Sequence, residues 1–180
     1  MEQKAIRITQ NWIERWIIAH QVCPFASKVY RLEQIHYRVL REVSFEQKLL
    51  AVQQMLQILD EQKQWDTALL IFPQSFQNNF LDYLDFLALA EMLLKDLNYE
   101  GVYQIASFHP QYQFAGSTEE DPANYTNRSP FPMLHFLREA SVERVLQQYQ
   151  NPVAIPDRNI DLARDQGLNY LQRLLKSCHQ

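Results

Sequence analysis

The sequence has 180 residues, which suffice for one domain with a sizeable core and are rather few for two. A hydrophobic content of 47% with 21% charged residues is ordinary for a soluble globular protein and excludes a globally disordered one. The net charge of −4 offers no basic surface for nucleic acid or an anionic membrane, so we expect neither as a partner.

The N-terminus and the cysteines predict a cytoplasmic protein. Charged residues interrupt positions 1–16 before any long apolar segment develops, which is unlike a secretory signal. No apolar stretch is long enough to span a bilayer. The two cysteines, Cys23 and Cys178, are too few for a disulfide framework and lack the spacing of a zinc site. We therefore expect reduced thiols.

The first half of the chain alternates between helix and strand patterns. Apolar residues at helical spacing, a proline at a helix start and a capping-box sequence mark helices, whereas short alternating or continuously apolar runs mark strands. The predicted elements are a helix over 3–21, a short helix over 24–31, a strand over 35–43, a helix over 44–61 and a strand over 67–72.

The second half continues the alternation. We expect a helix over 79–97, a strand over 101–108, a helix over 131–149 and a final helix over 157–178. No repeat or linker divides the chain, which favours a single globular domain over residues 1–180. The order of elements predicts an α/β fold with a small sheet of about three strands covered by helices, and helices at both termini. Whether the sheet is parallel or mixed stays open.

The stretch Ser107–Glu139 contains a long connection with no helical or strand period. A connection of this length inside a compact domain is usually functional or disordered. Disordered segments lack aromatic residues, but this one is rich in them. Its aromatic residues are Phe108, Tyr112, Phe114, Tyr125 and Phe131. We therefore expect an ordered loop that builds a site.

His109 lies where the strand before this loop ends. Ligands of open α/β sheets bind outside the carboxyl ends of the strands, and histidine titrates near neutral pH. His109 is therefore a candidate general base, general acid or metal ligand. The structural alternative is a histidine that caps the strand end by bonding a backbone carbonyl.

The polar segment that follows supplies candidate substrate-binding residues. Asn124, Tyr125, Asn127 and Arg128 lie together just before the predicted helix over 131–149. A planar guanidinium beside a helix N-terminus is a common way to hold carboxylate or phosphate. In the alternative, Arg128 clamps loop carbonyls and Asn124 forms a turn.

On that predicted helix, His135, Arg138 and Glu139 fall at i, i+3 and i+4, on one side near its start. They are the remaining substrate-binding candidates, because two basic groups and a carboxylate near the loop would complete a polar pocket. The alternative is a solvated helix face with an internal ion pair.

Cys23 is the sharpest single candidate, because we place it at the N-cap of the predicted helix over 24–31. The helix dipole and free N–H groups would lower the pKa of such a thiol and make it reactive. Ala26 stands where a dithiol site would have its second cysteine, so dithiol exchange is not expected. The alternative is a buried, inert cysteine.

The leading hypothesis is an enzyme acting on a small anionic metabolite. Cys23 would be the nucleophile or redox thiol and His109 its base, while Arg128 and Arg138 would hold the anion. The chain has no glycine-rich phosphate loop, which argues against Walker-type and Rossmann-type nucleotide sites, and the identity of any cofactor stays open.

Two alternatives belong to other classes. In the first, the aromatic loop over 107–131 docks a partner or a second copy in a homo-oligomer, because tyrosine and phenylalanine are typical interface anchors. In the second, His109, His135 and Asp121 form the site of a metal-dependent enzyme, although their spacing matches no metal motif and the leading hypothesis uses no metal.

Several long stretches also carry a resemblance. They read CPFA at Cys23–Ala26, ASFHPQYQFAG at Ala106–Gly116, DPANYTNRSP at Asp121–Pro130 and LREASVE at Leu137–Glu143. The sequence is similar over nearly its whole length to an uncharacterised bacterial family, domain of unknown function 1415. The resemblance implies a cytosolic, single-domain bacterial protein and supplies no catalytic residues.

Overall fold

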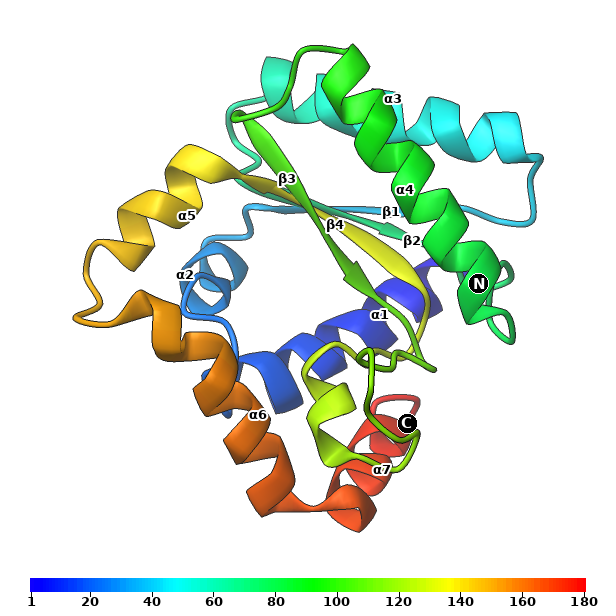
Figure 1. Ribbon diagram of the computed structural model, residues 1–180. Coiled ribbons are helices and arrows are strands. Elements are labelled where there is room, and N and C mark those ends of the chain that lie inside the picture. Colours follow the sequence, from blue (N-terminus) through cyan, green and yellow to red (C-terminus); the bar gives the residue numbers. More distant parts are fainter.

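The computed structural model describes residues 1–180 and has a four-stranded sheet between two layers of helices (Figure 1). The strands are β1 (Ile35–Val39), β2 (Thr67–Ile71), β3 (Tyr103–Phe108) and β4 (Met133–Arg138). Their order is β1-β2-β4-β3; β1 and β2 are parallel, and β4 runs antiparallel to both of its neighbours. The predicted α/β class is confirmed, with one more strand than expected and a mixed sheet.

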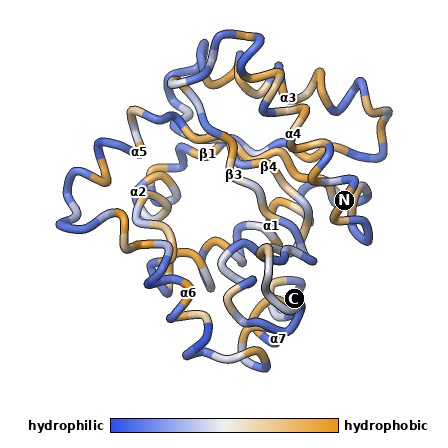
Figure 2. The backbone as a smooth tube through the Cα atoms, viewed as in Figure 1, coloured by the Kyte–Doolittle hydropathy of each residue, from blue (hydrophilic) through white to orange (hydrophobic).

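One layer consists of α3 (Phe45–Glu61) and α4 (Phe80–Asp96), which lie above the sheet in Figure 1. The predicted capping box is present, since the Ser44 hydroxyl accepts the N–H of Gln47 and the Gln47 side chain accepts the N–H of Ser44. Hydrophobic segments of these helices and of the strands meet in the middle of the molecule, and blue, hydrophilic segments lie at its periphery (Figure 2).

The other layer joins the two ends of the chain. It comprises α1 (Glu2–Trp12), the π-helix η1 (Ile13–Ile18), α2 (Ala26–Arg31), α6 (Ile155–Gln166) and α7 (Leu168–Ser177). The shorter elements are the 3-10 helices η2 (Pro122–Thr126) and η3 (Pro152–Ala154) and the helix α5 (Glu139–Leu146). None of the helices has the length and apolar character needed to cross a lipid bilayer.

The predicted helix over 131–149 is wrong. Its first part is the strand β4, and only Glu139–Leu146 is helical. Successive residues of a strand point to opposite faces of the sheet, and β4 is covered on both. Leu134 and Phe136 enter the α3–α4 core, whereas Met133 and Leu137 enter the other. A strand buried on both faces loses its alternation, and leucine, methionine and arginine also favour helix.

Other boundaries differ more modestly. The first helix continues as a π-helix and ends at Ile18 rather than 21, and the first strand ends at Val39 rather than 43. The predicted final helix is divided into α6 and α7 at Gly167, whose φ of 76° and ψ of 154° suit only glycine. This break turns α7 back along the layer that contains α1, where Asn11 donates to the Cys178 carbonyl.

Candidate functional site

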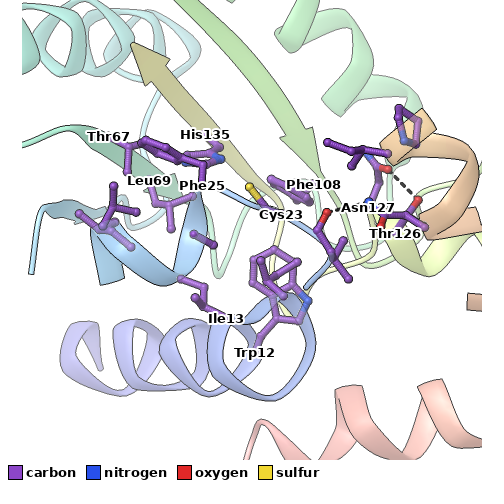
Figure 3. A pocket seen from close by; sticks show the side chains of 18 of the residues that line it. Trp12, Ile13, Cys23, Phe25, Thr67, Leu69, Phe108, Thr126, Asn127 and His135 are labelled. Carbon is purple, nitrogen blue, oxygen red and sulfur yellow. Dashed lines mark hydrogen bonds between the residues drawn. The ribbon is translucent and has the colours of Figure 1, made fainter. Parts of the chain in front are cut away.

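A cavity of about 350 Å³ lies between the sheet and the layer of terminal helices (Figure 3). Its lining comes from α1, η1, α2, α6, the long loop, and strands β1, β2, β3 and β4. Fourteen of the twenty lining residues are hydrophobic, and none is Asp, Glu, Lys or Arg. A mostly apolar cavity of this size with a few polar groups is typical of small-molecule sites.

Cys23 lies in this lining, in the turn between η1 and α2. The helix begins at Ala26 with Phe25 at its N-cap, so Cys23 precedes the cap instead of occupying it. Burial raises the pKa of the Cys23 thiol, and the nearby backbone N–H groups of Phe25 and Ala26 offset only part of the rise. The predicted lowering of this pKa is therefore wrong.

His135 reaches the same cavity from the central strand β4. The Thr67 hydroxyl donates to the Phe136 carbonyl oxygen at 2.6 Å, so at 2.7 Å it accepts the N–H at Nε2 of His135. This assignment leaves Nδ1 as an acceptor with no partner in the chain. Burial lowers the pKa of His135 to about 4, which keeps the ring neutral at pH 7.

Cys23 and His135 therefore bring a thiol and an imidazole to one apolar chamber. In Figure 3 the sulfur of Cys23 is directed toward the side of the cavity where the His135 ring lies. No hydrogen bond joins the two side chains, and both are neutral at pH 7. The arrangement is an un-ionised pair, unlike a preformed thiolate–imidazolium pair.

The polar side chains at the loop end of the cavity bond to one another. Thr126 donates to the side-chain oxygen of Asn127 at 2.9 Å, shown as a dashed line in Figure 3, and Asn127 donates to the Ser107 carbonyl at 3.4 Å. On α6, the Asn159 amide donates to the carbonyl of Val22 at 2.7 Å, next to Cys23. Asn127 is thus the one member of the predicted loop set that borders the cavity.

Trp12 is part of the cavity lining, and its buried indole nitrogen has no hydrogen-bond partner. The Trp12 side chain is 2% exposed, and no other buried side-chain nitrogen or oxygen in the protein is unpaired. Leaving a buried donor unpaired costs about 1–3 kcal/mol. Such an exception in a well-paired interior requires an explanation.

His109 lies elsewhere, packed against the rings of Phe80 and Tyr83 with centroids 5.0 Å away in each case. Its Nε2 donates to the Phe76 carbonyl at 2.8 Å, and its Nδ1 accepts the N–H of Gln111 at 3.0 Å. Burial lowers the pKa of His109, opposed in part by the bond to Phe76. Both nitrogens are occupied, so the structural alternative describes this histidine.

Arg128 clamps the loop. Its Nε donates to the Tyr112 carbonyl and a terminal nitrogen donates to the Glu119 carbonyl, both at 2.9 Å, and its guanidinium lies 5.0 Å from the Tyr125 ring centroid. Tyr125 is buried, and its carbonyl oxygen accepts the indole N–H of Trp16. Two of the three guanidinium nitrogens of Arg128 are thus directed at backbone oxygens, and Arg128 does not border the cavity.

Asn124 organises the same loop from inside. Its side-chain oxygen accepts the N–H of Phe114 and the hydroxyl of Ser117, each at 3.0 Å, and its amide donates to the Thr118 carbonyl at 2.8 Å. Because the side chain is fully buried, it serves to order the loop and is not open to a ligand.

The predicted pocket of His135, Arg138 and Glu139 is also wrong, because these residues do not share a helix. Arg138 lies on the α3–α4 side of the sheet, where it donates to the Leu59 carbonyl at 2.5 Å and the Tyr103 hydroxyl at 2.9 Å. Glu139 begins α5 outside the cavity.

No three His, Cys, Asp or Glu side chains gather closely enough to hold a metal ion. Asp121 caps η2 and pairs with Arg164 of α6 at 2.9 Å, on the surface and apart from both His109 and His135. The aromatic loop turns inward as well, since Tyr112 contacts Phe80 and Phe114 borders the cavity. The geometry supports neither the three-residue metal site nor a row of exposed aromatic anchors.

A family model described as "Protein of unknown function (DUF1415)" matches residues 4–173. The chain belongs to this family. The resemblance seen in the sequence is thereby confirmed. Searches of the curated proteins and of the solved structures returned no match to the DUF1415 chain.

The lining includes residues that sequence reasoning missed. Thr67 begins a continuously apolar run, Trp12 belongs to an amphipathic helix pattern, and Asn159 follows a proline-rich stretch. Each of these patterns is typical of a structural role. Of these three residues, only Thr67, a polar residue at the edge of an otherwise apolar strand, has a signal in the sequence that points to the site.

Proposed function

We propose that the DUF1415 chain binds a small, uncharged and mainly apolar molecule in the Cys23–His135 cavity. The observation that carries this proposal is the lining, which is predominantly hydrophobic and has no charged side chain. Transfer of apolar surface from water into such a chamber is favourable in proportion to its area. An anion would lose its hydration without gaining a counter-charge, because Arg128 and Arg138 are engaged elsewhere.

A second candidate is an enzyme acting on the same class of molecule. It is favoured by the thiol and imidazole that share the cavity. The sulfur would add to the carbonyl carbon of the substrate and the C=O π electrons would move to the carbonyl oxygen, while the thiol proton passes to Nδ1 of His135 and from there to that oxygen. No hydrogen bond joins the two groups at rest, so substrate binding must bring them within hydrogen-bond reach.

Titration with the uncharged fluorophore N-phenyl-1-naphthylamine tests the binding proposal. Cys23→Phe fills part of the cavity, whereas Cys23→Ala at the same position removes the thiol and keeps the space open. We expect saturable binding to the wild type and to Cys23→Ala, and at least tenfold weaker binding to Cys23→Phe.

Thermal unfolding confirms that the variants are folded, and Ile160→Phe on α6 replaces Cys23→Phe if that variant does not fold. Equal affinity of the wild type and the filled variant, or no saturable binding to the wild type, would overturn the proposal. For the second candidate, turnover or adduct formation must be lost in Cys23→Ala.

A further inference from the structure

We infer that the ligand of this cavity carries a hydrogen-bond acceptor, a carbonyl or hydroxyl oxygen on its apolar body, which receives the indole N–H of Trp12. This inference rests on the proposed function and narrows its ligand class. It begins with the unpaired indole nitrogen of Trp12, which is exceptional among the buried polar side-chain atoms of the protein.

The neighbouring tryptophan shows what the fold ordinarily provides. Trp16 is equally buried, and its indole N–H donates to the Tyr125 carbonyl at 3.0 Å. Trp65 also has an acceptor, the side-chain oxygen of Gln62 at 3.2 Å. Trp12 is thus the one indole of three that lacks a partner, and it is the one that lines the cavity.

No acceptor atom of the chain lies within hydrogen-bond distance of the Trp12 nitrogen. In the lining, the Thr67 hydroxyl accepts from His135 and the Asn127 side-chain oxygen accepts from Thr126, while the free Nδ1 of His135 is out of reach of the indole. The acceptor for Trp12 therefore has to come from the occupant. A single acceptor on an otherwise apolar molecule meets this requirement without introducing a charge.

The local backbone supports the assignment. Trp12 ends α1, and the six residues that follow form the π-helix η1, which contributes Ile13 and Ile17 to the cavity wall. π-helical turns are rare and occur frequently at functional sites. The Trp12 ring is further fixed by edge contact with Phe108, at a centroid distance of 5.1 Å. The donor is thus held by rigid neighbours, which lowers the entropic cost of binding.

Two uncharged probes of nearly the same shape test the inference. Acetophenone carries a carbonyl oxygen, and α-methylstyrene has a methylene group in its place. Titration calorimetry on the wild type should give about tenfold tighter binding of acetophenone, as expected for one additional hydrogen bond in an apolar site. In Trp12→Phe the ratio should fall to about one, whereas Trp16→Phe should keep the wild-type ratio.

Both probes meet the same enlarged space in a given variant. The ratio of their affinities for that variant therefore corrects for the space that the substitution opens. Thermal unfolding of the ligand-free variants adds a matched control, because Trp16→Phe breaks an existing hydrogen bond and Trp12→Phe breaks none. A second measurement uses the wild type alone. Acetophenone should shift the indole N–H resonance of Trp12 downfield and leave those of Trp16 and Trp65 unchanged, whereas α-methylstyrene should not produce this downfield shift.

The outcomes separate the two proposals. Equal binding of both probes to the wild type, or a preference that persists in Trp12→Phe, would overturn the acceptor inference and leave the apolar site standing. Failure of both probes and of N-phenyl-1-naphthylamine to bind the folded wild type would overturn the site itself and this inference with it.

Discussion

The two faces of the sheet are built for different purposes. On the α3–α4 side, twelve of the fifteen clustered core residues have no exposed surface, against four of eighteen on the side of the terminal helices. The second side also contains the cavity, a thiol, an imidazole and an unpaired indole donor. One face of the sheet thus supplies stability through close packing, and the other gives up some packing for a site.

Substitution of two adjacent leucines of β2 should change the free energy of unfolding most, and it tests the difference between the two faces. Leu70 enters the tightly packed core, whereas Leu69 borders the cavity. Leu70→Ala should lower the free energy of unfolding by about 3–5 kcal/mol, and Leu69→Ala by roughly 1–2 kcal/mol less, because part of its surroundings is already empty. Urea denaturation measures both. Equal losses would contradict the distinction between the faces.

The half-buried histidine of the cavity, His135, should make stability depend on pH. Because the folded-state pKa of His135 is lowered to about 4 from an ordinary 6.5, the unfolded chain binds more protons between these values. The contribution of His135 to the free energy of unfolding is complete above pH 6.5. It falls as the pH drops toward 4, by about 3 kcal/mol in total.

Denaturant titrations of the wild type and His135→Gln over this pH range isolate the effect. The substitution should lower stability at pH 7, where it removes the bond to Thr67, and should flatten the decline below pH 6.5. Parallel curves for the two proteins would show that His135 titrates normally in the folded state.

The smallest expected effect concerns the rate at which the thiol reacts. Cys23 retains some exposure toward the cavity, while Cys178 is fully buried, and burial raises the pKa of both thiols. Iodoacetamide should alkylate Cys23 slowly at pH 7, faster than Cys178, with an apparent pKa above the ordinary value of about 8.5. Mass spectrometry locates the label. Rapid alkylation near pH 6 would instead support a preformed thiolate.

Local signals in the sequence predicted much of the scaffold. The capping box at Ser44 located the start of α3, because caps act over a few residues, and apolar residues at helical spacing located α4. The strand β4 was missed because both of its faces are buried, which removes the alternation that identifies a strand. With β4 assigned to a helix, Arg138 was placed beside His135, although the two lie on opposite faces of the sheet.

The site was predictable only in part. Cys23, Asn127 and His135 were candidates and do border the cavity, but Cys23 was paired with His109. That pairing depended on which side of the molecule each side chain faces, and no short sequence pattern specifies this. The unpaired nitrogen of Trp12 was equally hidden, since an amphipathic pattern predicts burial and says nothing of a missing acceptor.

The hydrogen bond from Asn159 to Val22 has a consequence for biosynthesis. It joins residues 137 positions apart and fixes the backbone next to Cys23. A ribosome therefore releases the turn that carries the thiol long before the segment that encloses it, and contacts of such separation form slowly. Four residues of α6 line the cavity, namely Ile155, Pro156, Asn159 and Ile160. The wall of the cavity is therefore incomplete until α6 has packed. Ligand binding by the cavity therefore requires that α6, near the C-terminus, has packed against the N-terminal helices.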